Sequence, residues 1–307
     1  MRSMAKNIGK SFKLIENLYE GSFDGLKVLT GYPEIDEQIS GLHCVDLVAV
    51  VGDSGSGKTS FLANVALNIA DQSSQRVLFY SLQYPAVQLA QRMLFIKGKR
   101  SAHEMIRGYI TIEDWHEMTN TSWTLSNLPL LIEDGAVEDV DCMLKKIRLR
   151  QQKIPDLKLI IIDSIDMLAI SGTAHYSECL RKIKATAVDI RIPFLISAFI
   201  RKEHTKTKRK TTLFEERIQA IETYADTVMH IRMDSGNISA RYNDIYRKRK
   251  GDINRQKLLP CIPEIYMTVK TEIAFIKNTY GTKGSVFLTF IPQQFRSESD
   301  EGFTIQD

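Results

Sequence analysis

The segment VVGDSGSGKTS at residues 50–60 contains residues whose types and spacing could bind a phosphate chain. It fits the pattern G-x-x-x-x-G-K-[ST], with Gly52 and Gly57 at the two glycine positions. Glycines let consecutive backbone N–H groups turn toward an anion, Lys58 would reach the β- and γ-phosphates, and Thr59 would offer its hydroxyl to Mg²⁺. The alternative is a chance match in a glycine-containing turn. The residues predicted to bind the nucleotide are Gly52, Ser54, Gly55, Ser56, Gly57, Lys58, Thr59 and Ser60.

The segments on either side of this loop favour nucleotide binding over a chance match. DLVAVV at 46–51 is a Val-rich apolar run, as expected of a parallel strand that is buried on both faces. TSFLANVALNIA at 59–70 has the composition of a helix, whose positive dipole end would point at the phosphates. The predicted order of strand, loop and helix is the one that a phosphate loop requires.

A second nucleotide signal is Asp163, which ends the apolar run LIIID at 159–163. A carboxylate at the end of a buried strand can hold Mg²⁺, directly or through water, opposite the Thr59 hydroxyl. The alternative is an ordinary Asp that caps the next helix. Because a phosphate loop precedes it in the same chain, we predict that Asp163 and Thr59 are the metal ligands.

Strand-like apolar runs alternate with helical patterns along the chain. They lie at 46–51, 76–82, 128–134, 157–163, 192–199 and 226–232. This alternation predicts an α/β fold with a mostly parallel sheet, flanked by helices and joined by right-handed crossovers. Two further runs, EIAFIKN at 272–278 and SVFLTFI at 285–291, are joined by a glycine-containing turn and predict a β-hairpin at the sheet edge near the C-terminus.

Composition excludes several classes of protein. With 307 residues and 43% hydrophobic content, the chain can bury one large α/β core. The cysteines Cys44, Cys142, Cys179 and Cys261 include no C-x-x-C pair, so neither a zinc site nor a disulfide framework is predicted. No apolar run approaches the roughly 18 residues of a membrane span, and the N-terminus lacks the apolar core of a signal peptide. We expect a soluble, cytoplasmic protein without a membrane partner.

The first 28 residues are predicted to form an arm before the core domain at 29–297, and residues 298–307 a C-terminal tail. Ile8, Phe12, Ile15 and Leu18 have helical spacing and predict a short amphipathic helix in the arm. Such a helix can dock on a neighbouring copy of the chain or pack on its own domain, and both alternatives stay open.

Two basic segments make nucleic acid the predicted partner. RKEHTKTKRK at 201–210 follows a predicted strand and is expected to be a loop, and RYNDIYRKRKGDINRQK at 241–257 has tyrosines among its cations. Phosphate backbones attract such charge without regard to base sequence, whereas the alternative is a solvated charged loop. The predicted DNA-binding residues are Arg201, Lys202, Lys206, Lys208, Arg209, Lys210, Arg247, Lys248, Arg249 and Lys250.

Over residues 29–297, these motifs resemble the C-terminal RecA-like ATPase domain of DnaB-type replicative helicases. TGYPEIDEQISGL at 30–42 is similar to the family's opening motif, and VLFYSLQYPAVQLAQRML at 77–94 is similar to a stretch that other RecA-like proteins lack. The resemblance implies a RecA-like P-loop NTPase core in a hexameric ring that hydrolyses ATP between protomers and pulls single-stranded DNA through its centre, with replication proteins as partners. The chain is expected to be this motor domain with its linker arm, without the family's N-terminal domain.

The chain departs from the family at positions that the resemblance marks as catalytic. Gln83 stands where the family has a catalytic Glu, and a carboxamide can hold a water molecule but cannot accept its proton. The closing hairpin keeps Lys277 but has Thr279 at the arginine position, and an arginine finger contributes roughly 10³- to 10⁵-fold in rate elsewhere. Ala198 or Phe199 replaces a strand-final Gln. The resemblance implies Lys58, Gln83, Asp163 and Lys277 as the catalytic positions.

Two functions of different classes stay open. The first is a helicase-like motor that hydrolyses ATP while acting on single-stranded DNA. The second is a catalytically impaired binding module that holds ATP structurally and assembles with replication proteins. Residues that could replace the missing groups are the carboxylates Asp166, Glu215 and Glu216 and the cations Arg201, Arg217 and Lys283.

Overall fold

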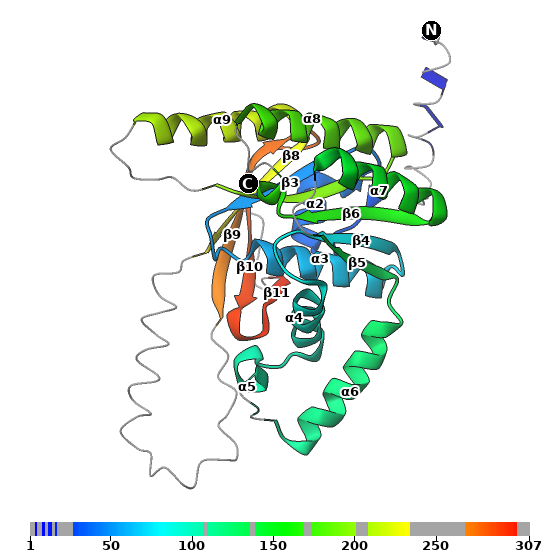
Figure 1. The fold of residues 1–307 in the computed structure, drawn as a ribbon, viewed down its shortest axis with the longest axis vertical. Coiled ribbons are helices and arrows are strands. Elements are labelled where there is room, and N and C mark those ends of the chain that lie inside the picture. The colour runs from blue at the N-terminus through cyan, green and yellow to red at the C-terminus, as the bar shows by residue number, and fades with distance from the viewer. Residues whose placement is uncertain are drawn as a thin grey trace.

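A nine-stranded sheet runs through the computed structural model, which describes residues 27–106, 108, 110–135, 139–168, 173–200, 208–233 and 268–299, with six positions between 4 and 16 (Figure 1). The strand order is β11-β10-β9-β8-β3-β7-β6-β4-β5. The parallel strands are β3 (Leu47–Gly52), β4 (Arg76–Ser81), β5 (Leu130–Asp134), β6 (Leu157–Asp163), β7 (Phe194–Phe199) and β8 (Thr227–Met233). The antiparallel strands are β9 (Val269–Asn278), β10 (Ser285–Ile291) and β11 (Arg296–Ser299). The predicted mostly parallel sheet is confirmed.

The predicted strands lie where the apolar runs placed them, and the predicted hairpin is present as β9 and β10. A short strand that the sequence did not indicate, β11, pairs outside the hairpin and forms the edge of the sheet. β11 also continues through Ser299, past position 297 where the core domain was predicted to end. Most of the predicted arm helix at 8–18 lies outside the described residues, but Ile8 and Phe12 are described and exposed.

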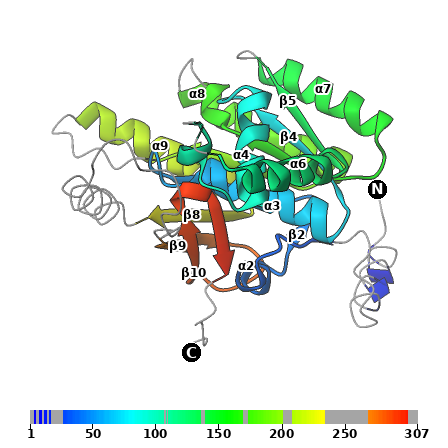
Figure 2. The same cartoon turned by 90° about the horizontal axis from the view of Figure 1, so that it is seen from below.

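Helices cover both faces of the sheet. One layer contains α7 (Val140–Lys153), α8 (Thr173–Ile190) and α9 (Lys208–Tyr224), and the other contains α3 (Lys58–Gln72) and α4 (Ala86–Gly98) (Figures 1 and 2). The short helix α5 (Ala102–Ile106) and α6 (Ile112–Ser126) extend beyond α4 (Figure 1). The three-layer arrangement confirms the predicted α/β class.

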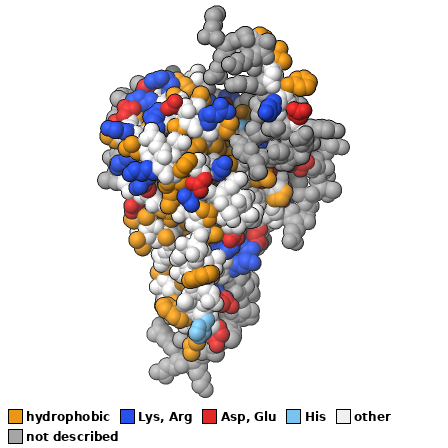
Figure 3. Space-filling view, turned by 90° about the vertical axis from the view of Figure 1, so that its right-hand side faces the viewer, with side chains coloured by type: hydrophobic (Ala, Val, Ile, Leu, Met, Phe, Trp, Pro, Cys, Tyr) orange, Lys and Arg blue, Asp and Glu red, His pale blue; other side chains and the backbone are white. Residues whose placement is uncertain are grey.

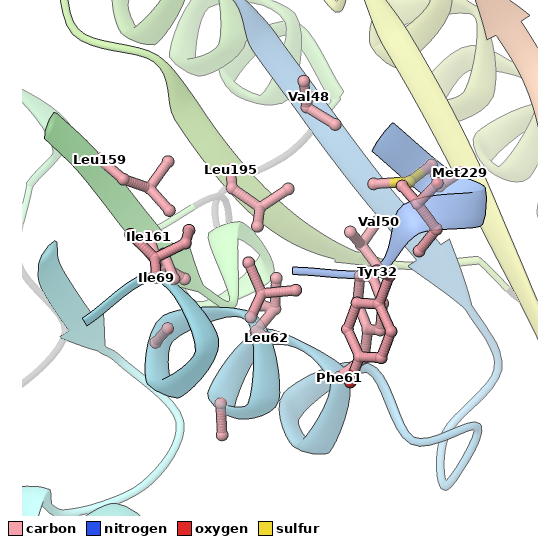
Figure 4. Packing of buried hydrophobic residues seen from close by; sticks show 14 of the residues in the cluster. Tyr32, Val48, Val50, Phe61, Leu62, Ile69, Leu159, Ile161, Leu195 and Met229 are labelled. Carbon is pink, nitrogen blue, oxygen red and sulfur yellow. The ribbon is translucent and has the colours of Figure 1, made fainter. Parts of the chain in front are cut away.

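Successive side chains of β3 point to opposite faces of the sheet, and both faces are buried, which explains why its sequence is a continuous apolar run. Val48 and Val50 pack on the α3 side of the sheet, whereas Leu47, Ala49 and Val51 pack on the side of α7, α8 and α9. Figure 4 shows Val48 and Val50 on the same side as side chains of α3. Because both faces of β3 are buried, every residue of this strand must avoid water, and the phosphate loop that follows is held by a rigid element.

The opening motif at 30–42 forms α2 (Pro33–Ile39) between the short paired strands β1 (Lys27–Val28) and β2 (Leu42–His43). The Asp36 carboxylate accepts hydrogen bonds from the backbone N–H groups of Thr30 (2.7 Å) and Gly31 (3.1 Å). The Tyr32 hydroxyl donates to the carbonyl oxygen of Ser297 at 3.2 Å, and its ring stacks on Phe61 of α3. The motif therefore ties the start of the core domain to β11 and to the phosphate-loop helix.

The surface carries a basic region that was not among the predicted DNA-binding residues. On the face shown in Figure 3, Lys and Arg side chains gather over the part of the molecule that α7 and α8 form. The cations of α7 are Lys145, Lys146, Arg148, Arg150 and Lys153. Two of them are engaged in ion pairs, Arg148 with Asp189 at 3.2 Å and Arg150 with Glu133.

Candidate nucleotide-binding site

The predicted phosphate loop joins the carboxyl end of β3 to the first residue of α3. Gly52 has no room for a side chain, because a Cβ atom there would lie 2.6 Å from Ser56 Oγ and 2.8 Å from the carbonyl oxygen of Ile231. Gly57 has a φ angle of +88°, which L side chains rarely adopt, and it is the N-cap of α3. Both motif glycines are therefore required by the shape of the loop.

The start of α3 is open to an anion. No side chain caps the helix, so its first N–H groups and its positive dipole end face the loop. Ser56 Oγ is buried there without a hydrogen-bond partner. Lys58 Nζ donates to the carbonyl oxygens of Gly52 (2.9 Å) and Asp53 (2.8 Å), which places the ammonium group over the loop. The arrangement has the donors that a phosphate chain needs.

Asp163 is the last residue of β6 and is 1% exposed. Its Oδ1 accepts a hydrogen bond from the Ser197 hydroxyl, and its Oδ2 is buried with no hydrogen-bond partner. Burial raises the pKa of Asp163, while the hydroxyls of Ser197 and Thr59 and the charge of Lys58 lower it. One carboxylate oxygen near the Thr59 hydroxyl is therefore free to bind a cation.

These two residues fit Mg²⁺ bound together with a nucleotide. Among the described residues, no group of three or more His, Cys, Asp or Glu could hold a metal by itself. Mg²⁺ bound with a nucleotide uses one or two protein ligands and completes its shell with water and phosphate oxygens. The Thr59 hydroxyl and the open Asp163 oxygen match that requirement.

Gln83 lies beside Asp163 in the loop between β4 and α4. Its backbone N–H donates to the carbonyl oxygen of Asp163 at 3.2 Å, and that of Leu82 donates to the same atom at 2.7 Å. The Gln83 side chain is exposed. Position 83 is therefore near the proposed metal site, but it carries a carboxamide there.

Among the alternative carboxylates, the structure brings Asp166 to the phosphate loop. Burial lowers the pKa of Lys58 there, and the negative charges of Asp163 and Asp166 partly oppose that lowering. Glu215 and Glu216 are exposed on α9. Arg217, which was considered as a cation acting on another copy, lies 3.6 Å from Asp166 of its own chain. Lys283 is exposed in the turn between β9 and β10.

Sequence reasoning missed Arg92, which lies on α4 next to the phosphate loop. Its guanidinium donates to Ser60 Oγ at 3.2 Å and lies 5.2 Å from the ring centre of Tyr84 and 4.5 Å from that of Phe295. These cation–π contacts hold the Arg92 guanidinium beside the phosphate loop. The only sequence signal was its place within the stretch at 77–94, because Phe295 comes from the other end of the chain.

A comparison with protein families matches residues 27–299 to the DnaB-like helicase C terminal domain. The chain belongs to this family. The replicative DNA helicase DnaB of Geobacillus stearothermophilus is 28% identical, in an alignment that covers 95% of this chain and 63% of that protein. The replicative DNA helicase DnaC of Bacillus subtilis is 27% identical, over 92% of this chain and 59% of that protein. The chain spans about three fifths of the length of these curated relatives.

Solved structures agree on the fold. An ATPase domain of known structure superimposes with a TM-score of 0.75 at 21% identity, over 98% of this chain and all of that one. A DnaB-like replicative helicase, solved in work on its interactions with primase, superimposes with a TM-score of 0.74 at 20% identity, over 98% of this chain and 68% of that one. The predicted resemblance to the DnaB-type motor domain is confirmed.

In this DnaB-like domain, Lys277 lies away from the other predicted catalytic residues. It pairs with Val228 near the start of β8, whereas the phosphate loop follows the carboxyl end of β3, which runs parallel to β8. Lys277 Nζ donates to the carbonyl oxygens of Glu222 (2.8 Å) and Ala225 (2.6 Å), beside the end of α9. Lys58, Gln83 and Asp163 are brought together in one chain, and a catalytic role for Lys277 requires a second copy.

Most of the predicted DNA-binding residues lie outside the described residues, namely Arg201, Lys202, Lys206, Arg247, Lys248, Arg249 and Lys250. Lys208, Arg209 and Lys210 lie in the first turn of α9, so the expectation of a loop at these three positions is wrong. Lys and Arg are good helix formers, and they continue a helix whose later residues Ile218 and Ile221 pack on the core. None of the described helices is long and apolar enough to cross a membrane.

Proposed function

We propose that this protein binds ATP with Mg²⁺ at the phosphate loop and uses it while acting on single-stranded DNA in replication. The observation that carries the proposal is the buried Oδ2 of Asp163, which has no hydrogen-bond partner. It lies at the end of β6 near Thr59, beside a phosphate loop whose helix has no side-chain cap. The loop from Gly52 to Ser60 would hold the phosphates, and Lys58 would contact the β- and γ-phosphates. Bound Mg²⁺ would neutralise phosphate charge during transfer.

The base of the nucleotide would lie beside the cluster that Arg92 forms with Tyr84 and Phe295. The Arg92 guanidinium is bonded to Ser60, the residue after the proposed magnesium ligand Thr59, and it lies near both aromatic rings. A flat, cationic and aromatic surface next to the phosphate loop suits an adenine ring. A base stacked there would bring α4 and the C-terminal part of the domain into contact with the same ligand.

The proposed assembly is a ring, a hexamer by family resemblance, in which one copy's hairpin faces the next copy's phosphate loop. The support is that Lys277 and the phosphate loop lie at opposite ends of parallel strands in one chain. The arm at 1–28 is proposed to contact the neighbouring copy. Removing residues 1–20 should then shift the sedimentation profile toward smaller species, and an unchanged profile would end this part of the proposal.

A second candidate function is favoured by Gln83 and Thr279, which replace the family's catalytic Glu and arginine finger. In that case the domain binds ATP to hold an assembly of replication proteins and scarcely hydrolyses it. Both candidates require the same nucleotide site and differ in turnover.

Steady-state ATP hydrolysis, measured with and without single-stranded DNA, distinguishes the two. We expect turnover that DNA stimulates and that Lys58→Ala abolishes. The matched control is Lys97→Ala, because Lys97 forms an ion pair with Asp71 on the surface of the same helical layer. ATP binding without turnover would support the assembly module, and no ATP binding at all would overturn the proposal.

The DNA part of the proposal predicts a change in salt dependence. Neutralising the predicted cations at 206–210 and 247–250 should weaken single-stranded DNA binding and reduce the slope of log K against log salt by about 0.7 for each phosphate that the protein no longer neutralises. Neutralising Lys145 and Lys153 on α7 is the control, since it removes positive charge from a described surface elsewhere, and the effects are compared for each charge removed. Equal effects per removed charge would assign the binding to net charge rather than to these segments.

A further inference from the structure

Hydrolysis at this phosphate loop needs a group that accepts the proton of the attacking water, and Gln83 cannot supply it. The carboxylate nearest to Gln83 along the sheet is Asp163, whose open oxygen lies near Thr59 and is proposed to bind Mg²⁺. A metal ligand is a poor proton acceptor, because the metal withdraws its electron density. Another carboxylate at this edge of the sheet is required.

Asp166 is held in one orientation by its own chain. It lies in the short 3-10 helix η1 (Ile165–Met167) directly after β6, and its Oδ2 accepts hydrogen bonds from Ser164 Oγ (2.6 Å) and from the backbone N–H of Phe199 (2.7 Å). Its Oδ1 is buried and has no hydrogen-bond partner. A carboxylate fixed through one oxygen thus presents a free lone pair on the other.

The same contacts place Asp166 at the phosphate loop. Phe199, whose N–H binds the carboxylate, has its ring centre 5.5 Å from Lys58 Nζ. Phe199 is also paired with Gly52, the first glycine of the loop, at the ends of β7 and β3. Asp166 therefore lies at the end of β7, the strand that pairs with β3 before the phosphate loop. Asp163 ends β6, the strand on the other side of β7.

Arg217 of α9 explains how a second carboxylate can stay near bound phosphates. Its Nη1 is 3.6 Å from Asp166 Oδ1, and the guanidinium lies 5.3 Å from the ring centre of the buried Tyr176 of α8. The charge of Arg217 offsets that of Asp166, yet the separation is too long for a hydrogen bond that would occupy Oδ1. Arg217 thus balances the charge of Asp166 without forming a hydrogen bond to Oδ1, which leaves that oxygen without a donor.

The other carboxylates near this edge lack these features. Asp53, Glu215 and Glu216 are exposed, and an exposed side chain retains the rotamer freedom that a general base must give up. Among these carboxylates, the half-buried Asp166 combines a fixed orientation with a buried oxygen that has no hydrogen-bond partner.

We propose that Asp166 is the general base that replaces the missing Glu, an inference that rests on the proposed ATP site. Water attacks the γ-phosphorus while Asp166 Oδ1 takes its proton, and a new P–O bond forms. The bond from the γ-phosphorus to the bridging oxygen breaks, and ADP leaves with the electron pair. The proton then passes from Asp166 to solvent, so that ATP and water give ADP, phosphate and a proton.

The test is Asp166→Asn, which keeps an oxygen that can accept from Phe199 and Ser164 but cannot take a proton. ATP affinity, measured by calorimetry on the full chain with Mg²⁺, should be unchanged within about threefold, whereas turnover should fall about 10²- to 10⁴-fold. A readout independent of activity is the affinity for ADP with aluminium fluoride, which mimics the transferred phosphoryl group. It should fall about tenfold in Asp166→Asn, while the affinity for ADP alone stays the same.

Glu216→Gln is the matched control, because it removes the same charge from an exposed site on α9 and should leave turnover unchanged. The double variant Asp166→Asn with Gln83→Glu should regain turnover, since it returns a carboxylate to the family's position. If Asp166→Asn fails to fold, Asp166→Glu supplies the same comparison, with turnover reduced because the carboxylate is displaced by one methylene group.

Turnover of Asp166→Asn within threefold of the parent would overturn the assignment. So would a parent protein that binds ATP but does not hydrolyse it, although nucleotide binding would then stand. A parent that binds no ATP would instead overturn the proposed function itself, which keeps the two failures distinct.

Discussion

Two regions at opposite ends of the parallel strands differ in how many of their polar side-chain atoms have hydrogen-bond partners. At the phosphate edge, where β3, β6 and β7 end, Ser56 Oγ, Asp163 Oδ2, Asp166 Oδ1 and the Tyr176 hydroxyl are buried without hydrogen-bond partners. The hairpin edge is the region around the turn between β9 and β10. There, Lys277 bonds to two carbonyl oxygens, Thr279 to the Asp226 carbonyl oxygen and Tyr280 to Asp46.

The difference indicates where the domain is built to receive a ligand. Buried polar atoms are normally bonded, so a cluster of open ones needs a reason. At the phosphate edge the proposed nucleotide and Mg²⁺ would supply that reason. Among the described residues of the hairpin edge, the buried side-chain polar atoms are hydrogen-bonded within the chain except His43 Nε2. The same chain thus keeps one edge ready for a ligand and the other closed.

The largest expected effect compares one lysine from each edge. Lys58→Ala should weaken ATP binding about 10- to 100-fold, because the truncated side chain can no longer donate a charge-assisted hydrogen bond to the phosphates. Lys277→Ala should leave the affinity of the single chain unchanged, because Lys277 lies at the other edge of the sheet. Calorimetric titration of both variants at low protein concentration checks this, and equal decreases in affinity would show that the two edges are not separate.

The stability of the protein without nucleotide tests the hairpin edge by itself. Lys277→Ala removes two hydrogen bonds to carbonyl oxygens beside the C-terminal end of α9. It also removes a positive charge that interacts favourably with the negative end of the helix dipole. The free energy of unfolding should fall by about 1–2 kcal/mol in urea titrations. Lys283→Ala, in the exposed turn of the same hairpin, should change it by less than about 0.5 kcal/mol. An unchanged Lys277→Ala would mean that the hairpin edge is not held by this side chain.

The sequence predicted the phosphate edge better than it predicted the contacts of the hairpin edge. Gly52, Lys58, Thr59 and Asp163 could be found because a local motif and a strand end determine where they lie. The bonds of Lys277 depend on how β9 meets the end of α9, far away along the chain, and no local pattern encodes that meeting.

The same limit explains what was missed at the phosphate edge. Asp166 was one of three carboxylates that the sequence could not rank, because its neighbours Phe199 and Arg217 come from β7 and α9. Arg92 meets Phe295 only through the packing of α4 against the C-terminal part of the domain. Fold class follows from periodicity along the chain, whereas these contacts follow from tertiary packing.

Asp163→Asn should stabilise the free protein, because it removes a charge whose burial raises the carboxyl pKa above its ordinary value of 3.8. A group with a raised pKa contributes stability that is complete below the unfolded pKa and is lost as the pH rises through the folded pKa. The stability advantage of Asp163→Asn should therefore grow as the pH rises from 4 toward 7.

A measurement of ATP binding by Asp163→Asn complements the measurement of its stability. Asp163→Asn should weaken the dependence of ATP affinity on Mg²⁺, since the open oxygen that would bind the cation loses its charge. Urea titrations at several pH values and calorimetry with and without Mg²⁺ measure the two effects. A variant that is destabilised at pH 7 would show that the Asp163 charge is satisfied in the free protein, which contradicts an edge kept open for a ligand.

The smallest expected effect comes from replacing one tyrosine at each edge by phenylalanine. The free energy of unfolding should change in opposite directions at the two edges. Tyr280→Phe removes a hydroxyl that donates to Asp46 Oδ1 at 2.8 Å, so the free energy of unfolding should fall by about 1 kcal/mol. Tyr176→Phe removes a buried hydroxyl without a partner, so the free energy of unfolding should rise by about 1 kcal/mol. Both rings remain, and the His43 ring keeps its contact with residue 280 at 4.2 Å between centres. Because each variant deletes a single oxygen atom, a common sign in urea titrations would mean that the two edges do not differ in how their polar atoms are satisfied.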